Sequence, residues 1–359
     1  MKAFARLIAL AAALMLLIAM PRAFAEEIDG DCVYTLVDES GRVLTRRGGK
    51  MYVGDEYISG DDRYYRIISV DDVSQTATAE DLGEATIDVS ALSSFLKAYA
   101  KTETDGEKLV CMYSTHSDES YVPTDGNSSL WENAGIYDVG NALKKELESR
   151  GIKTVYSKET FLPHDAGAYN RSRATAEELL KKGPDALLDI HRDATPADEY
   201  ETEVEGEDIS KVRLFVGRSN QNRAANKAFA QQIKKTADKE YPGLIKDIYI
   251  GKGNYNQELY PHALLLEFGT HKIEKDKAIG ATGYMADVLS QVLYGETAKA
   301  EETASPAIKG IAWAVGIAIA GALIYALVST GTFDGMKKKL ARGVSEITGG
   351  AIGKKPNNR

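Results

Sequence analysis

Cysteine, proline and net positive charge are scarce in this sequence. Its 359 residues include 2 Cys and 9 Pro, and the formal net charge is -9. Two cysteines exclude a small scaffold held together by disulfides, and the low proline content excludes a collagen-like repeat. An acidic chain also lacks the basic face that binds phosphates, so we expect no nucleic acid as the principal partner. With 43% hydrophobic residues, the chain can bury a sizeable core within two or three domains.

The negative charge lies in the middle of the chain. Residues 1–25 and 308–359 are both net positive, which leaves -18 for residues 26–307. In the first segment, Lys2 and Arg6 precede an apolar run, and an Ala-x-Ala motif stands at residues 23–25. This arrangement is typical of a secretory signal peptide over residues 1–25, with an uncleaved N-terminal anchor as the alternative.

A second apolar run, IAWAVGIAIAGALIYALV, contains no charged side chain. It is long enough to cross about 30 Å of hydrocarbon, so we expect a transmembrane helix at 309–330 after a polar linker at 297–308. Basic residues in the tail at 331–359, among them Lys337 and Arg342, predict a cytoplasmic C-terminus. The chain is therefore predicted to be a single-pass protein of the cell membrane, with its acidic middle on the extracytoplasmic side.

The exported part divides by pattern into two regions. Residues 26–100 contain short strand-like runs separated by turn residues, which predict a small antiparallel β domain without a catalytic constellation. Residues 105–296 alternate strands with amphipathic helices, for example a helix over 133–150. This alternation predicts an α/β three-layer sandwich with a mainly parallel sheet. Cys32 and Cys111 fall in different regions, and the sequence leaves open whether they pair or stay free.

Chemically suited side chains follow three predicted strands of the α/β region. His116 and Glu119 follow the first strand, His191 ends a second, and Glu267 ends a third. The carboxyl ends of strands are where ligands bind in such folds. Two His and one Glu are an open set of zinc ligands that leaves a position for water, as catalytic zinc requires. We expect His116, Glu119 and His191 to bind Zn²⁺ and Glu267 to act as the general base and acid.

Three segments, STHSDESYVP, LLDIHRDA and GNYNQELYPHALLLEFGTH, resemble those of the stage II sporulation protein P family. The resemblance covers about residues 105–295. It implies the fold of cell-wall amidases and a zinc-dependent N-acetylmuramoyl-L-alanine amidase, which cleaves the amide between N-acetylmuramic acid and the L-alanine of the stem peptide of peptidoglycan. It further implies a role in septal wall remodelling and engulfment during sporulation, with a membrane-bound lytic transglycosylase and a third sporulation membrane protein as partners.

The resemblance supports His116 and His191 as ligands and Glu267 as the catalytic carboxylate. The third ligand has two candidates. Glu119 fits an H-x-x-E spacing, whereas Glu132 stands where other cell-wall amidases place a glutamate that opens the first helix. We favour Glu119; Glu132 would otherwise favour the N-terminus of that helix by its charge.

Other polar residues near these motifs have weaker assignments. Asp193 is expected to orient His191, or to be an ordinary loop acid. Three arginines either bind carboxylates of the stem peptide or pair internally: Arg171, Arg173 and Arg192. Three further histidines are rival candidates for the metal ligands: His164, His262 and His271. Residues 254–257 either line the substrate groove or form a turn.

Two other functions are compatible with parts of this pattern. A zinc endopeptidase that cuts stem peptides or cross-links would use the same attack of water on an amide. An inactive wall-binding module that recruits other hydrolases would not need the complete set of four residues. Because His116, Glu119, His191 and Glu267 are all present, we favour an active enzyme.

Overall fold

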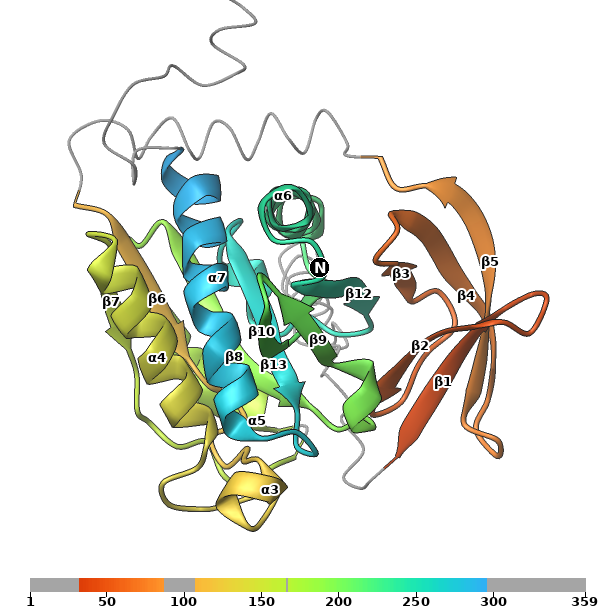
Figure 1. Ribbon diagram of the computed structural model, residues 1–359, viewed down its shortest axis with the longest axis horizontal. Helices are drawn as coiled ribbons and strands as arrows, with labels where there is room; N and C mark the ends of the chain where they lie inside the picture. The colour runs from red at the N-terminus through yellow and green to blue at the C-terminus, as the bar shows by residue number, and fades with distance from the viewer. Residues whose placement is uncertain (1–31, 87–106, 166, 296–359) are drawn as a thin grey trace, which may run out of the picture. The chain divides into compact units, whose positions relative to one another are not determined.

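A computed structural model describes residues 32–86, 107–165 and 167–295 (Figure 1). The predicted signal peptide, linker, transmembrane helix and basic tail lie outside these residues. Within the described part, no helix combines the length and the apolar character needed to cross a membrane. Cys32 and Cys111 are both free thiols.

The α/β region is built on six neighbouring strands in the order β12-β11-β13-β8-β6-β7. Strands β13, β8, β6 and β7 run parallel to one another, and β11 and β12 are parallel to each other but antiparallel to β13. The predicted α/β class with a mainly parallel sheet is thereby confirmed. The strands are β6 (Leu109–Tyr113), β7 (Lys153–Tyr156), β8 (Ala186–Asp193), β11 (Val212–Gly217), β12 (Ile245–Gly251) and β13 (Ala263–Thr270).

Helices cover both faces of this sheet. On one face α4 (Ile136–Ser149) lies beside α7 (Lys275–Tyr294), and α6 (Arg223–Glu240) packs next to α7 (Figure 1). Their apolar sides share one buried core with alternate strand residues such as Leu188 and Leu266. On the other face α5 (Ala168–Leu180) packs against β6 and β8. The helix predicted to start at Asn133 begins three residues later, at Ile136, because Asn133 has a positive φ of 54°.

Five strands precede this region and extend the same sheet. They are β1 (Val33–Asp38), β2 (Val43–Gly48), β3 (Glu56–Ile58), β4 (Arg63–Asp71) and β5 (Thr76–Glu84). Their pairing is antiparallel, as predicted, except that β1 and β5 are parallel. β3 pairs with β12 and so joins them to the α/β region. The division into domains at 26–100 and 105–296 stays a prediction.

Smaller elements lie around the sheet in the described part of the chain. A β-hairpin that was not predicted from the sequence pairs β9 (Glu201–Val204) with β10 (Glu207–Ser210). Three short helices lie in loops: α3 (Val122–Asp125), η1 (Ala197–Glu199) and η2 (Gln257–Leu259).

Candidate metal centre

The loop after β6 forms one side of the site. Residues 114–120 are all buried, although each of them is polar. The backbone N–H of Glu119 donates to the carbonyl of His116 at 3.2 Å, and Glu119 forms a β-bridge with Ser129. This tight turn brings the side chains at the two ends of the H-x-x-E spacing together. Their burial requires partners, because polar groups removed from water are costly unless they are paired.

The structure brings His116, Glu119 and His191 into one group. Nδ1 of His116 is 3.5 Å from one Glu119 carboxylate oxygen, and Nδ1 of His191 is 3.5 Å from the other. One candidate ligand atom from each residue lies within 4.8 Å of the others. Tetrahedral zinc ligands at about 2.0–2.2 Å from the ion are roughly 3.3–3.5 Å apart. The group therefore has the donor types for a metal ion, and its two nitrogen–oxygen distances match the spacing of zinc ligands.

The charges in the metal group shift the pKa values of Glu119 and His191 in opposite directions. Burial alone would raise the pKa of Glu119, but the positive charges of His191 and Arg192 outweigh it and hold this pKa well below its usual range. Burial alone would lower the pKa of His191, yet the negative charges of Asp189 and Glu119 raise it well above its usual value. Glu119 is thus an ionised carboxylate, and a metal ion must displace a proton from His191.

Asp189 is the residue that orients His191, and the prediction that Asp193 does so is wrong. Oδ1 of Asp189 lies 2.9 Å from Nε2 of His191, which leaves Nδ1 directed to Glu119. Asp189 is itself held by Thr115, whose backbone N–H and hydroxyl donate to it at 2.8 and 2.6 Å. A carboxylate behind a histidine fixes its tautomer and ring orientation in metal sites. Asp193 instead accepts hydrogen bonds from Tyr200 and Arg213.

Glu267 lies beside this group on the neighbouring strand. It pairs in register with His191, and paired residues of parallel strands project from the same face of the sheet. The hydroxyl of Tyr200 lies 2.9 Å from both Glu267 and Asp193. Burial, and then the charge of Asp193, raise the pKa of Glu267 to about 7, although Arg213 and Arg47 oppose this shift. A carboxyl with such a pKa can both accept and return a proton near neutrality.

The structure separates the two candidates for the third ligand. Glu119 is 3% exposed and belongs to the group, whereas Glu132 is exposed and precedes the helix by several residues. The geometry therefore agrees with Glu119.

The rival histidines occupy other positions. The ring of His164 stacks on that of His116 at 3.9 Å, and its Nδ1 lies 3.0 Å from Asp118. His262 contacts the carbonyl of Asp185 at the opposite end of β8, and the backbone N–H of His271 donates to Asp193. Among the described residues, the metal-ligand group contains none of these three.

The three candidate arginines pair internally. Arg171 contacts Asp165 and the carbonyl of Phe161, and Arg173 contacts Glu177 and Glu258. Arg192 donates from its backbone N–H to Glu119 at 2.9 Å and from its guanidinium to the carbonyl of Ser128. Of the polar residues at 254–257, Asn256 and Gln257 are buried and hydrogen-bonded to the protein, which agrees with a structural role.

Fold and site together define an α/β protein with a candidate metal centre at the carboxyl edge of its parallel strands. The family model of stage II sporulation protein P matches residues 49–290, and the chain belongs to this family. A curated relative, stage II sporulation protein P of Bacillus subtilis (strain 168), is 30% identical over 213 residues, or 54% of this chain. The match spans 53% of that relative, about half of its length.

Some solved structures have a distant likeness to this chain. An N-acetylmuramyl-L-alanine amidase from Mycobacterium abscessus, in its apo form, has 17% identity and a TM-score of 0.35, over 53% of this chain and 98% of that one. An N-acetylmuramoyl-L-alanine amidase from Clostridium difficile 630 has 13% identity and a TM-score of 0.36, over 55% of this chain and all of that one.

Proposed function

We propose that this chain is a zinc-dependent peptidoglycan hydrolase that cleaves the amide between N-acetylmuramic acid and the L-alanine of the stem peptide. The observation that carries the proposal is the buried group of His116, Glu119 and His191 with Glu267 on the adjacent strand. Membership of the stage II sporulation protein P family supports a role in sporulation. The amidase reaction is the one that the family resemblance implies.

The donor set suits zinc. Two imidazole nitrogens and one carboxylate oxygen are the ligands of several catalytic zinc sites, which keep a fourth position for water. Bound zinc would lower the pKa of that water to about 7 and polarise the substrate carbonyl. In this chain His116, Glu119 and His191 would hold the ion, and Asp189 would keep Nδ1 of His191 available to it.

Glu267 is suited to move the proton. As an ionised carboxylate it takes a proton from the attacking water, and as the acid it gives that proton to the amine that leaves. Its raised pKa, about 7, keeps both forms accessible. The hydroxyl of Tyr200, 2.9 Å away, holds one carboxylate oxygen in place.

The test is to incubate the protein with purified peptidoglycan and to identify the new ends by mass spectrometry. Release of whole stem peptides with a free L-alanine N-terminus is expected. Products that are cut only within the peptides would show an endopeptidase and not an amidase. Peptidoglycan that stays intact would support a wall-binding module without hydrolase activity.

A pair of matched variants tests the metal ligands. Glu119→Ala is expected to lose bound zinc and activity, whereas Glu132→Ala, at an exposed position, is expected to keep both. Zinc is measured by elemental analysis of the purified proteins. Zinc retained in Glu119→Ala but lost in Glu132→Ala would exchange the roles of the two glutamates.

We also propose that residues 309–330 anchor the enzyme in the cell membrane, with residues 26–307 on the extracytoplasmic side facing the wall. The apolar run and the basic tail that follows it support this orientation. A lytic transglycosylase and a third sporulation membrane protein are the proposed partners. Protease added outside intact protoplasts should digest residues 26–307 and spare the tail; digestion of the tail would reverse the orientation.

A further inference from the structure

A row of charged residues crosses four neighbouring strands on the face that carries the candidate site. Register pairs His191 with Glu267, Glu267 with Arg213, and Arg213 with Asp247. Arg213 and Asp247 are both fully buried. The metal group and Glu267 are thus continuous with an ion pair in the interior of the sheet.

Arg213 is held from several sides. Its Nε donates to Asp247 at 2.6 Å, and its Nη1 donates to Asp193 at 2.9 Å and lies 3.7 Å from Glu267. Every nitrogen of the guanidinium has a partner, since Nη2 also donates to Asp247 at 2.9 Å. A planar guanidinium fixed in this way sets the positions of the carboxylates around it.

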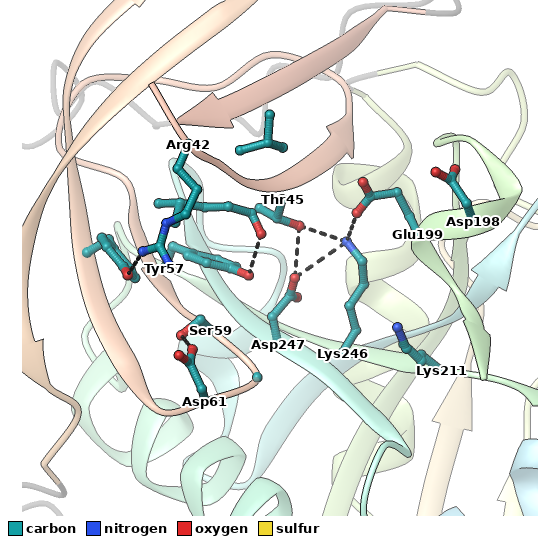
Figure 2. A pocket seen from close by; sticks show the side chains of 14 residues that line it. Arg42, Thr45, Tyr57, Ser59, Asp61, Asp198, Glu199, Lys211, Lys246 and Asp247 are labelled. Carbon is teal, nitrogen blue, oxygen red and sulfur yellow. Dashed lines mark hydrogen bonds and ion pairs between the residues drawn. The ribbon is translucent and has the colours of Figure 1, made fainter. Parts of the chain in front are cut away.

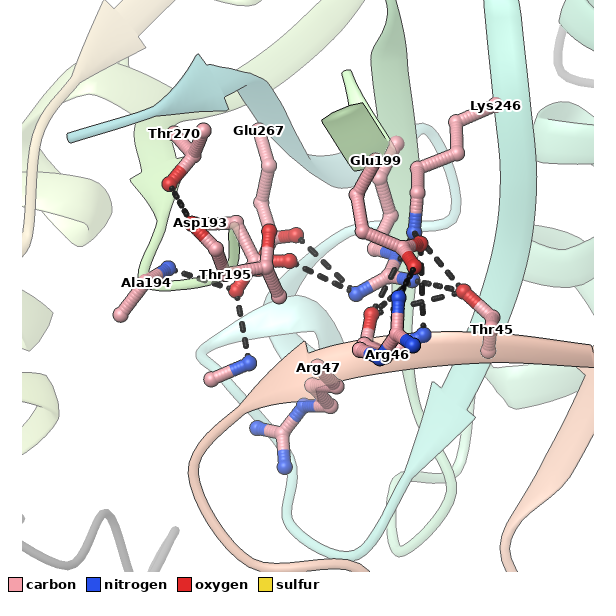
Figure 3. A network of polar contacts seen from close by, with 12 residues as sticks. Thr45, Arg46, Arg47, Asp193, Ala194, Thr195, Glu199, Lys246, Glu267 and Thr270 are labelled. Atoms are coloured by element: carbon pink, nitrogen blue, oxygen red, sulfur yellow. Dashed lines mark hydrogen bonds and ion pairs between the residues drawn. The ribbon is translucent and has the colours of Figure 1, made fainter. Parts of the chain in front are cut away.

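Strand β2, from the N-terminal region, supplies the remaining contacts. The hydroxyl of Thr45 accepts from Nη2 of Arg213 at 2.8 Å and donates to Asp247 at 3.1 Å, and the carbonyl of Arg46 accepts from Arg213 at 2.9 Å. Figure 3 shows Thr45 and Lys246 on one side of this network and Asp193 and Glu267 on the other.

The end of β2 reaches the opposite side of the network. The backbone N–H of Gly48 donates to Oδ1 of Asp193 at 2.9 Å. A Cβ on Gly48 would lie 2.6 Å from the Cβ of Ala194, so only glycine allows this approach. The same strand therefore contacts Arg213, which lies 3.7 Å from Glu267, and Asp193, which shares the hydroxyl of Tyr200 with Glu267.

We propose that β2 is a positioning element of the active site: Thr45, the carbonyl of Arg46 and the N–H of Gly48 fix Arg213 and Asp193, which in turn fix the carboxylate of Glu267. This inference rests on the proposed role of Glu267. Thr45 accepts from two cations, because Nζ of Lys246 also donates to it at 2.7 Å. Without this hydroxyl, Arg213 and Lys246 both lose a hydrogen-bond acceptor, and Arg213 shifts.

Thr45 is not part of the metal group. Together with Tyr57, Lys246 and Asp247 it lines a polar cavity of about 390 Å³ to which none of His116, Glu119 and His191 contributes (Figure 2). A substitution at Thr45 therefore reaches the site through Arg213 and not by contact with the metal group. We therefore expect a substitution at Thr45 to lower the reaction rate and to leave metal binding unchanged.

The experiment compares three variants in the full chain. Thr45→Val keeps the shape and removes the hydroxyl, Thr45→Ser keeps the hydroxyl, and Thr35→Val makes the same change on the neighbouring strand β1, where Thr35 pairs with Arg46. Thr45→Val is expected to lower kcat by roughly tenfold or more, with KM and zinc content unchanged, because small misplacements of a catalytic group are costly. Thr45→Ser recovers the rate, and Thr35→Val does not change it.

A wild-type rate in Thr45→Val, or an equal loss in Thr45→Ser, would overturn the proposal. A wild-type protein that does not cleave peptidoglycan would refute the proposed function instead. In that case a crystal structure of Thr45→Val decides the present inference: a displaced Glu267 carboxylate supports it and an unmoved one overturns it. If Thr45→Val does not fold, Thr45→Ala, which leaves room for a water, is measured in the same way.

Discussion

The contact between Asp189 and His191 allows a quantitative prediction for Asp189→Asn. Asparagine has the same shape, and its amide oxygen can still accept the backbone N–H of Thr115. What is lost is the negative charge at 2.9 Å from the ring. Removal of such a carboxylate weakens metal binding by about 10–100-fold, or roughly 1.4–2.7 kcal/mol.

A second effect of Asp189→Asn acts in the opposite direction. Asp189 and Glu119 both raise the pKa of His191 by their negative charges, and the effect of Asp189 is the larger one. Its removal therefore lowers that pKa and reduces the competition of protons with zinc. At the highest pH of the assay, where protons compete least, we expect the full loss of zinc affinity, about 10–100-fold. The difference in zinc affinity between the variant and the wild type should become smaller as the pH falls.

The assay is competition for zinc with a chromophoric chelator over a range of pH. Asp185→Asn is the matched control, because Asp185 precedes the same strand but accepts from the N–H of Leu109 and the hydroxyl of Tyr294, away from the metal group. Its zinc affinity should equal that of the wild type. Equal affinity of Asp189→Asn and wild type at high pH, or a difference independent of pH, would refute the reasoning.

Three further predictions concern Glu267, Tyr200 and the metal. Glu267→Gln should lower kcat by about 10²–10⁴-fold and keep its zinc, and a zinc-free variant would show a structural role instead. Tyr200→Phe removes a hydrogen bond that lowers the pKa of Glu267, so the acidic limb of the pH profile of kcat/KM should move to higher pH; an unchanged limb would contradict this. Without metal, the raised pKa of His191 stabilises the fold below about pH 6.5, and this stabilisation is lost as pH rises through the folded-state pKa. The increase in Tm caused by zinc should therefore grow with pH, which calorimetry with and without chelator would measure, with His191→Ala as the control.

The candidate ligands could be predicted from the sequence because each follows a strongly apolar strand. Parallel strands end at one edge of the sheet, and this shared edge alone groups His116, His191 and Glu267. Asp189 could have been found by the same reasoning. It lies two residues before His191 on a strand, and residues at that spacing share a face.

The network around Arg213 could not be predicted in this way. Its members come from strands whose neighbours in the sheet are far away in the sequence, and neither sheet order nor register is encoded locally. The only local sign was a charged residue within the apolar run of β11. Asp189 and Asp193 both lie two residues from His191 on β8, so the spacing alone does not tell which of them contacts the imidazole.

The pairing of β3 with β12 has a consequence for the order in which the protein folds. Ile58 pairs with Ile248, so β3 has an unpaired edge until most of the chain has been synthesised. Contacts between such distant segments form slowly, and unpaired edges favour aggregation. The strands β6, β7 and β8 have partners much nearer in sequence and can assemble earlier. The N-terminal strands, although they are made first, can therefore join the sheet only after β12 has been made.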